Sequence, residues 1–324
     1  MALKVVLTDH VFPNLDGVKA ALDSVGAELV YLAAAPGTTD EQKIADAVVD
    51  ADAVITCYAG ITAKVIEGMT KCRSISKTGI GVNNIDVAAA SAKGIRVLNQ
   101  PDYCVEEVSD HTVALILASA RRIVSFATAT QKGVWSLDGN RDMMRLRGKT
   151  LGLLGFGRIA RLTAQKMQGF GVKILAYDPY VTAEQCKELG VQKAELEEVI
   201  RESHIISLNL PLTAETEKMV NAEFLGKMRN DAILVNTSRG GLIDEAALVK
   251  ALEDKTIIGA GLDVLVDENP ANIGANPLTK LPNCIVTPHA AFVSVDATIE
   301  LSEKIMADVV LVLEGKEPKN QVNR

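Results

Sequence analysis

The sequence predicts an α/β protein with two doubly wound parallel sheets, and three observations indicate this. Short apolar runs alternate with stretches of helical periodicity, which is typical of parallel strands covered by helices on both faces. A chain of 324 residues, 48% of them hydrophobic, is long enough for two domains of ordinary size. The apolar runs also fall into two series, one on each side of Pro101.

The first series contains the strands of one sheet and ends before a predicted helix. After Pro101, residues 106–124 carry apolar side chains at helical spacing behind an acidic first turn, so we expect one long crossing helix there. The strands expected before it are residues 4–8, 28–31, 53–57, 73–76 and 96–99.

The second series supplies a second sheet, and the chain then ends in an amphipathic helix at residues 294–313 with no further strand to follow. That helix could pack back on the first sheet, which predicts a discontinuous domain of residues 1–100 plus 294–324 around a domain of residues 101–293. Residues 133–147 lack periodicity and hold the only tryptophan, Trp135, so they form either an arm or interface, or a simple loop. The strands expected in this series are residues 150–154, 173–177, 205–208, 232–236, 258–263 and 285–287.

Composition argues against several classes of partner. The net charge of -7 and the absence of a basic block argue against nucleic acid. The N-terminus lacks the features of a secretory signal, and no apolar run approaches the roughly 20 residues of a membrane helix. Five cysteines without a C-x-x-C pair indicate reduced thiols. We therefore expect a cytoplasmic protein without a metal site, and neither nucleic acid nor a membrane as partner.

A glycine pattern predicts a dinucleotide site. Gly155, Gly157 and Ala160 form G-x-G-x-x-A between a predicted strand and a predicted helix, which suits a tight turn, close approach of a pyrophosphate and close helix packing. Asp178 follows the next strand, where an acidic side chain suits a ribose diol and repels a 2'-phosphate, so NAD is favoured over NADP. The simpler interpretations are a structural turn at the glycines and a turn initiated by Asp178 and Pro179.

Three polar residues follow strands of the second series and suit one reaction. Arg239, Glu268 and His289 would emerge at the carboxyl edge of the sheet, where ligands bind in open α/β folds. Reduction of a 2-oxo acid needs a proton donor, a cation for the carboxylate and fixed geometry, and these roles suit His289, Arg239 and a carboxylate that favours the imidazolium form. Taken singly, Arg239 could instead be a surface arginine, Glu268 a solvated acid of a loop, and His289 a histidine whose hydrogen bonds are satisfied at the end of a strand.

The motifs G-F-G-R-I-A, N-T-S-R-G-G, G-L-D-V and T-P-H-A-A-F, in this order, resemble the NAD-dependent D-2-hydroxyacid dehydrogenase family over nearly the whole chain. The resemblance implies a flavodoxin-like substrate domain, a Rossmann NAD-binding domain and a homodimer formed through the latter. It further implies that His289 is the acid/base, that Glu268 is its partner and that Arg239 anchors the substrate. Asp263 would meet the nicotinamide carboxamide, and the other residues implied at the cofactor are Arg158, Ile159, Thr237 and Ser238.

The resemblance extends to a substrate loop in the first domain. Residues 77–86 match that loop, and their glycines would expose N–H groups to the substrate carboxylate, unless they only turn the chain. Tyr58 is expected beside the loop. The substrate-binding residues implied in the loop itself are Lys77, Gly79, Ile80 and Gly81.

Two departures from the family and one further likeness stand out. Asn269 separates Glu268 from the following proline, which puts the loop path in question, and residues 56–60 lack the arginines of phosphoglycerate dehydrogenases, so a phosphorylated substrate is not expected. The chain stops soon after its last helix, so we expect no regulatory domain. Residues 101–112 are similar to the branch of the C-terminal-binding-protein corepressors, which leaves an NAD-responsive interaction protein as the alternative. There His111 would approach the cofactor, or it is a structural histidine.

Overall fold

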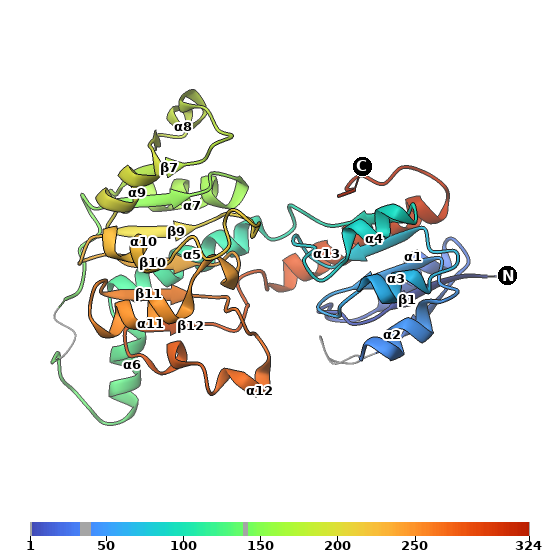
Figure 1. The fold of residues 1–324 in the computed structure, drawn as a ribbon, viewed down its shortest axis with the longest axis horizontal. Helices are drawn as coiled ribbons and strands as arrows, with labels where there is room; N and C mark the ends of the chain where they lie inside the picture. Colours follow the sequence, from blue (N-terminus) through green and yellow to red (C-terminus); the bar gives the residue numbers. More distant parts are fainter. Residues whose placement is uncertain (1, 33–39, 139–141, 324) are drawn as a thin grey trace. The chain divides into compact units, whose positions relative to one another are not determined.

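The computed structural model describes residues 2–32, 40–138 and 142–323. The chain divides into two compact units (Figure 1). Residues 1–104 together with 293–324 form the first unit, and residues 105–292 form the second. Each unit contains one parallel sheet, so the predicted α/β class with two parallel sheets is confirmed.

The first unit is built on a five-stranded sheet in the order β2-β1-β3-β4-β5, in which every paired strand is parallel. The helices α2, α3 and α4 pack on it through one apolar cluster, and the C-terminal helix α13 packs against α1 and β4. The strands are β1 (Leu3–Leu7), β2 (Ala27–Tyr31), β3 (Ala53–Thr56), β4 (Ser74–Lys77) and β5 (Arg96–Leu98). The helices are α1 (Asp16–Asp23), α2 (Glu41–Val48), α3 (Ala63–Glu67), α4 (Val87–Ala92) and α13 (Val295–Leu313).

The second unit is built on a seven-stranded parallel sheet in the order β12-β11-β10-β9-β6-β7-β8. The chain runs outward from β6 to β8 and then returns to β9 on the other side of β6, so the order reverses at the carboxyl end of β6. The strands are β6 (Thr150–Leu154), β7 (Lys173–Tyr177), β8 (Gln192–Lys193), β9 (Ile205–Leu208), β10 (Ile233–Asn236), β11 (Gly259–Leu262) and β12 (Cys284–Val286). Its longer helices are α5 (Val105–Ala120), α6 (Ile123–Gln131), α7 (Arg158–Gln168), α9 (Leu196–Glu202) and α11 (Glu245–Glu253), and its shorter ones are α8 (Ala183–Glu188), α10 (Ala222–Lys227) and α12 (Pro270–Ile273).

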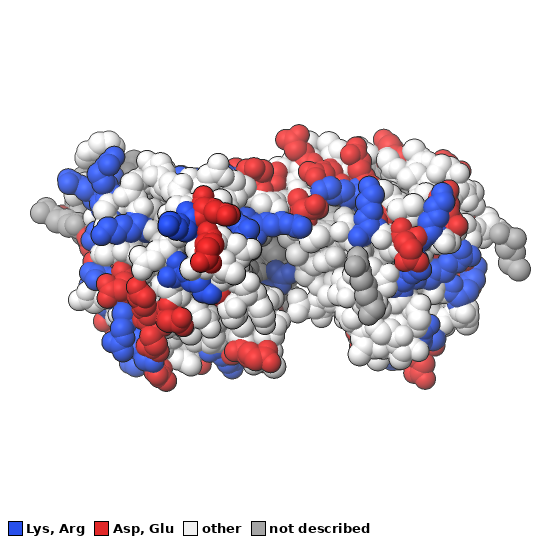
Figure 2. Space-filling view, turned by 90° about the horizontal axis from the view of Figure 1, so that it is seen from above, with Lys and Arg blue, Asp and Glu red and all other residues white. Residues whose placement is uncertain are grey.

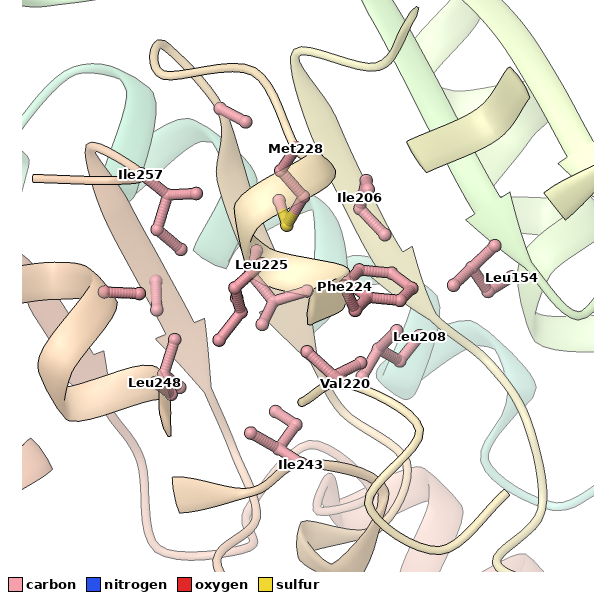
Figure 3. Packing of buried hydrophobic residues seen from close by; sticks show 14 of the residues in the cluster. Leu154, Ile206, Leu208, Val220, Phe224, Leu225, Met228, Ile243, Leu248 and Ile257 are labelled. Carbon is pink, nitrogen blue, oxygen red and sulfur yellow. The ribbon is translucent and has the colours of Figure 1, made fainter. Parts of the chain in front are cut away.

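Helices cover both faces of this second sheet. Buried residues of α9, α10 and α11 pack on one face, where Phe224 of α10 is directed toward Ile206 and Leu208 of β9 (Figure 3). Buried residues of α5, α7 and α8 form the cluster on the other face. With both faces covered, the central strands β9 and β10 are buried at every residue and mostly apolar, which explains why they read as apolar runs in the sequence.

The long helix expected over residues 106–124 is two helices, α5 and α6. The chain breaks after α5 at Arg122, which adopts the left-handed conformation with φ of 54°. Its buried guanidinium is bound by Asp142 at 2.6 Å from Nη2 and by the carbonyl of Ile258 at 2.9 Å. These partners are distant in sequence, so the periodicity of the segment does not reveal the break. In the described part of the chain no single helix is long and apolar enough to cross a membrane, and α5 and α6 reach that length and apolarity only as a pair bent by 66°.

Two further segments bear on the predictions. Helix α13 begins where Ser294 accepts a hydrogen bond from the N–H of Ala297 at 2.8 Å, and it belongs to the first unit. The segment 133–147 forms no helix or strand in its described part, while residues 139–141 lie outside the described residues. Trp135 in this segment is 92% exposed. Its use as an arm or interface stays a prediction.

Charged side chains of both signs are interspersed over the face shown in Figure 2. Close ion pairs occur in the second unit, for example Lys227 with Glu197 at 2.8 Å and with Glu223 at 2.7 Å. Exposed pairs of this kind contribute at most about 1 kcal/mol to stability, so the fold depends mainly on its buried clusters.

Candidate active site

The turn after β6 requires glycine at its first position. Gly155 has φ of 87°, and a Cβ there would lie 2.5 Å from the carbonyl oxygen of Asn209. Its N–H donates to the carbonyl of Tyr177 at 2.8 Å, which holds the turn against the end of β7. Any side chain would therefore push the turn away from the point where the strand order reverses.

Gly157 differs from Gly155 because its own backbone does not require glycine. It precedes α7 with φ of -76°, and within the described structure a Cβ there would meet nothing within 4 Å. The space beside it, at the N-terminus of an eleven-residue helix, suits an anionic group that approaches the backbone. Arg158 and Ile159 form the exposed and half-buried start of that helix, and Ala160 is fully buried against the sheet. The residues present thus fit a dinucleotide pyrophosphate.

Asp178 lies beside the same turn. Its Oδ2 accepts a hydrogen bond from the N–H of Phe156 at 2.8 Å, and its Oδ1 accepts one from the N–H of Tyr180 at 2.8 Å. The bond from Tyr180 belongs to the turn that the simpler interpretation expected at Asp178 and Pro179. The bond from Phe156 connects the carboxylate to the glycine turn. Because each carboxylate oxygen accepts more than one hydrogen bond, the group can also accept from ribose hydroxyls.

The loop that carries Arg239 is shaped by a buried amide. Asn236 is fully buried at the end of β10, where its Oδ1 accepts from the N–H of Ser238 at 2.9 Å and its Nδ2 donates to the carbonyl of Arg239 at 2.9 Å. A Cβ on Gly240 would lie 2.0 Å from the carbonyl carbon of Leu265, so glycine lets this loop pack directly on the loop after β11. Arg239 is half-buried, and its Nη1 donates to the carbonyl of Ser238 at 2.6 Å.

The hydroxyls of this loop are also bound. Ser238 donates through Oγ to the carbonyl of Leu208 at 2.8 Å, and the Oγ1 of Thr237 lies 2.8 Å from that of Thr112 in α5. These bonds connect the loop to β9 on one side and to α5 on the other. The positions expected to line the cofactor are therefore held by tertiary contacts.

Asp263 organises the turn after β12. It is 1% exposed, and its carboxylate accepts from the hydroxyl of Thr287 at 2.5 Å and from the N–H groups of Ala290 at 3.0 Å and Ala291 at 2.9 Å. Its carbonyl accepts from the N–H of His289 at 2.8 Å. His289 adopts the left-handed conformation with φ of 52°, which is uncommon for a residue other than glycine and is stabilised here by these bonds.

The structure brings His289 and Glu268 together. Nδ1 of His289 lies 2.8 Å from Oε2 of Glu268, and both side chains are partly exposed. The ring of Phe292 packs edge-on against the imidazole at 5.9 Å between centroids. A carboxylate at Nδ1 favours the tautomer with a proton on that nitrogen and orients the opposite nitrogen, Nε2, for other partners.

The extra asparagine after Glu268 does not prevent this pairing. Asn269 caps α12 by accepting a hydrogen bond from the N–H of Ala271 at 3.0 Å, with Pro270 at the first helical position. Strand β12 runs over Cys284–Val286, one residue earlier than the predicted 285–287, and ends before Pro288. Arg239, Glu268 and His289 thus follow β10, β11 and β12, which are neighbours in the sheet.

His111 lies in α5 against this same network. Its Nε2 is 2.9 Å from the hydroxyl of Thr287 and 3.4 Å from Oδ1 of Asp263. The ring is therefore placed beside the residue expected at the nicotinamide. The same contacts satisfy a structural histidine, so both interpretations of His111 remain.

In the first unit, the predicted substrate residues lie in the loop after β3, at the end of β4 and in the loop that follows β4. The Nζ of Lys77 donates to the carbonyl of Cys57 and lies 5.4 Å from the centroid of the Tyr58 ring. Among the described residues, the N–H groups of Gly79, Ile80 and Gly81 donate no hydrogen bond within the protein. Three successive donors beside a lysine form a suitable site for a carboxylate.

Two ionisable groups, one in the loop after β3 and one beside Gly79, are kept neutral by burial. Burial raises the pKa of the Cys57 thiol to about 11. Burial likewise raises the pKa of Tyr103, whose hydroxyl lies 4.0 Å from the position of a Cβ on Gly79. Neither group adds a negative charge to the loop at neutral pH.

Sequence reasoning missed Asp9 and Thr287. Asp9 follows β1 and Thr287 follows β12, so both obey the rule that identified the other residues, namely a polar residue just after a parallel strand. Within the described ranges, no group of three or more His, Cys, Asp or Glu side chains is arranged to hold a metal ion.

The doubly wound sheet, the glycine turn at its reversal point and the acid at the end of the next strand define a dinucleotide-dependent oxidoreductase. Residues 113–291, more than half of the chain, match the family model described as D-isomer specific 2-hydroxyacid dehydrogenase, NAD binding domain. The chain belongs to the D-isomer specific 2-hydroxyacid dehydrogenase family. It is an NAD-dependent enzyme that transfers a hydride between the nicotinamide and a 2-oxo or 2-hydroxy acid.

Relatives and solved structures agree with this assignment. A glyoxylate reductase of Korarchaeum cryptofilum is 39% identical over 289 residues, which cover 88% of this chain and 86% of that protein. A D-3-phosphoglycerate dehydrogenase of Methanocaldococcus jannaschii is 36% identical over 323 residues, which cover 99% of this chain but 59% of that longer protein. The D-lactate dehydrogenase of Aquifex aeolicus, solved with NAD and lactic acid, is 27% identical with a TM-score of 0.88 and 99% coverage of both chains.

Proposed function

We propose that this protein interconverts a small, unphosphorylated 2-oxo acid and its D-2-hydroxy acid, with His289 as the acid/base. The observation that supports this most directly is the 2.8 Å pair between Nδ1 of His289 and Oε2 of Glu268, held at the carboxyl edge of the sheet. Such a pair provides an oriented proton donor next to the loop that carries a guanidinium. The nicotinamide, when bound, supplies or accepts the hydride.

The three side chains have distinct roles in this proposal. His289 donates a proton to the oxygen formed on the substrate and removes it in the reverse direction. Glu268 fixes the orientation of the imidazole through the bond to Nδ1. Arg239 binds the substrate carboxylate through its planar fork, with the additional effect of polarising the carbonyl.

The cofactor residues follow from the fit of the second unit to a dinucleotide. Gly155, Gly157 and the N-terminus of α7 with Arg158 and Ile159 would hold the pyrophosphate. Asp178 would accept hydrogen bonds from the ribose hydroxyls. The residues that we assign to the nicotinamide side are Thr237, Ser238, Asp263 and His111.

We assign the first unit as the substrate domain. The N–H groups of Gly79, Ile80 and Gly81 are suitable donors for a carboxylate, and Lys77 adds a cation near them. Tyr58 lies beneath that ammonium. The segment 56–60 contains no arginine, which argues against a phosphorylated substrate such as the phosphoglycerate of the longer relatives.

Two properties of the whole protein belong to this proposal. Five free cysteines suit a reducing compartment, so we infer the cytoplasm. We also infer a homodimer formed through the cofactor domain, since Val134, Trp135 and Leu137 expose apolar side chains in one segment of that domain. Sedimentation of the purified protein at several concentrations tests the dimer, and a monomer throughout would contradict it.

The substrate proposal is tested with purified protein, NADH and a panel of glyoxylate, hydroxypyruvate, pyruvate and branched 2-oxo acids. We expect turnover of the small members. His289→Ala should lose turnover by roughly a hundredfold or more while NADH binding is retained. Tight NADH binding without turnover of any member would instead support an NAD-responsive interaction protein. Unchanged turnover in His289→Ala would remove the acid/base assignment.

A further inference from the structure

Asp9 is a fully buried carboxylate at the carboxyl end of β1. It accepts hydrogen bonds from three successive N–H groups of the loop after β3: Cys57 at 2.9 Å, Tyr58 at 2.7 Å and Ala59 at 3.2 Å. The hydroxyl of Thr8 donates to the same carboxylate at 2.8 Å. All these groups are donors, which is the environment that a buried, ionised carboxylate requires.

This arrangement determines how the Cys57–Ala59 loop is oriented. With three successive N–H groups directed at Asp9, the loop cannot use them to bind another anion. Its carbonyl groups are directed at the neighbouring loop, where Nδ2 of Asn84 donates to Cys57 at 3.2 Å and to Ala59 at 2.8 Å. The Cys57 carbonyl also accepts from Lys77.

A continuous set of hydrogen bonds therefore runs from Asp9 through the Cys57–Ala59 loop to Lys77 and Asn84, which flank the N–H groups of residues 79–81. Lys77 passes close to Gly79, since a Cβ on that glycine would lie 3.6 Å from its Cε. The position of the ammonium relative to these donors depends on the Cys57 carbonyl, and hence on Asp9.

We propose that Asp9 is a positioning residue for the substrate: it holds the Cys57–Ala59 loop so that Tyr58 and Lys77 lie beside the anion-binding N–H groups of residues 79–81. This inference rests on the proposed function, which makes these loops the substrate-binding part of the first unit. Asp9 itself is buried and acts only through the loop.

The substitution Asp9→Asn tests this, because it keeps the shape of the side chain but removes the charge and places an NH2 group against N–H donors. We expect the KM for the 2-oxo acid to rise by roughly tenfold to a hundredfold, as a displaced binding group would cause. Turnover at saturation should change less, because the substitution weakens interactions that the substrate already makes with the protein before it reacts. The dissociation constant for NADH should not change, because the cofactor residues belong to the second unit.

The matched control is Asp52→Asn. Asp52 is a second buried aspartate of the same unit, 3% exposed, but it precedes β3 at the opposite edge of the sheet. It accepts from the N–H of Lys4 at 2.9 Å and pairs with Lys71 at 2.9 Å. Asp52→Asn should lower the melting temperature without raising the KM. An equal rise in KM in both variants would show that general destabilisation is the cause and would overturn the proposal.

A second variant and a second measurement guard against misfolding and against failure of the proposed function. Asn84→Ala breaks the next step of the same connection and should raise the KM in the same direction even if Asp9→Asn does not fold. Amide hydrogen exchange should be slow at Tyr58 and Ala59 in the wild type and faster in Asp9→Asn, whatever the substrate is. A folded Asp9→Asn protein with wild-type KM and wild-type exchange would refute the role. If the wild type turns over no 2-oxo acid while the exchange result holds, the proposed function fails and the loop-positioning role of Asp9 stands.

Discussion

The substitution Gly157→Ala separates cofactor binding from folding. Gly157 has φ of -76° and ψ of -166°, which alanine adopts without strain, and within the described structure the added Cβ would have no neighbour inside 4 Å. The protein itself therefore tolerates the methyl group. If a pyrophosphate approaches the backbone here, the methyl group takes part of its space.

The added methyl group should change the free energy of unfolding less than it changes the affinity for NADH. Replacing glycine by alanine at a compatible backbone position gains about 0.4–1 kcal/mol through the unfolded state, while alanine is a poorer helix-capping residue than glycine by a similar amount. The free energy of unfolding should thus change by less than about 1 kcal/mol. Overpacking against the ligand costs about 1–3 kcal/mol, which corresponds to NADH binding weakened roughly fivefold to more than a hundredfold.

Isothermal titration with NADH and thermal unfolding without the cofactor measure these quantities separately. The control is Gly155→Ala, where φ of 87° and a contact of 2.5 Å with the carbonyl oxygen of Asn209 predict loss of stability as well as of binding. Wild-type affinity for NADH in a stable Gly157→Ala protein would refute the placement of the pyrophosphate at this turn.

Three further predictions concern the active site and the pH dependence of stability. Arg239→Lys should raise the KM for the 2-oxo acid about tenfold or more, since an ammonium cannot bind a carboxylate bidentately, and a wild-type KM would argue against the anchor role. Thr287→Val leaves Asp263 without a hydroxyl donor and should destabilise the fold by about 1–3 kcal/mol and reduce turnover, whereas Thr287→Ser should restore both. Burial, with nearby cations, lowers the pKa of His204 below its usual 6.5. As the pH falls below about 6.5, the imidazole is therefore protonated more readily in the unfolded chain than in the folded one, and the free energy of unfolding decreases. His204→Gln should weaken that dependence in urea titrations between pH 5 and 8, and an unchanged slope would contradict it.

Most strands could be predicted from the sequence, because strands buried on both faces are continuous apolar runs bounded by polar or turn residues. The two-residue strand β8 (Gln192–Lys193) was missed, since it is too short for any periodicity and lies at the end of the sheet beside β7. The break at Arg122 was missed for a different reason: its partners Asp142 and Ile258 are brought to it by the fold.

The residues of the glycine turn and the three candidate catalytic residues could be found from the sequence, because each follows a strand and its type suits a single chemistry. The structure decided how they are held. Glu268 reaches His289 although Asn269 lengthens the loop, because that asparagine is used to cap α12.

By itself, the sequence determined the α/β class, the strand series and the cofactor type, since periodicity and turn chemistry are local properties of the chain. Only the tertiary structure decided that Asp9 orients the Cys57–Ala59 loop and that Asp263 holds His289 in its left-handed conformation. The physical reason is that a buried carboxylate selects its donors by their position in space, and residues separated by dozens of positions in the chain come within hydrogen-bonding distance only after the sheets have formed.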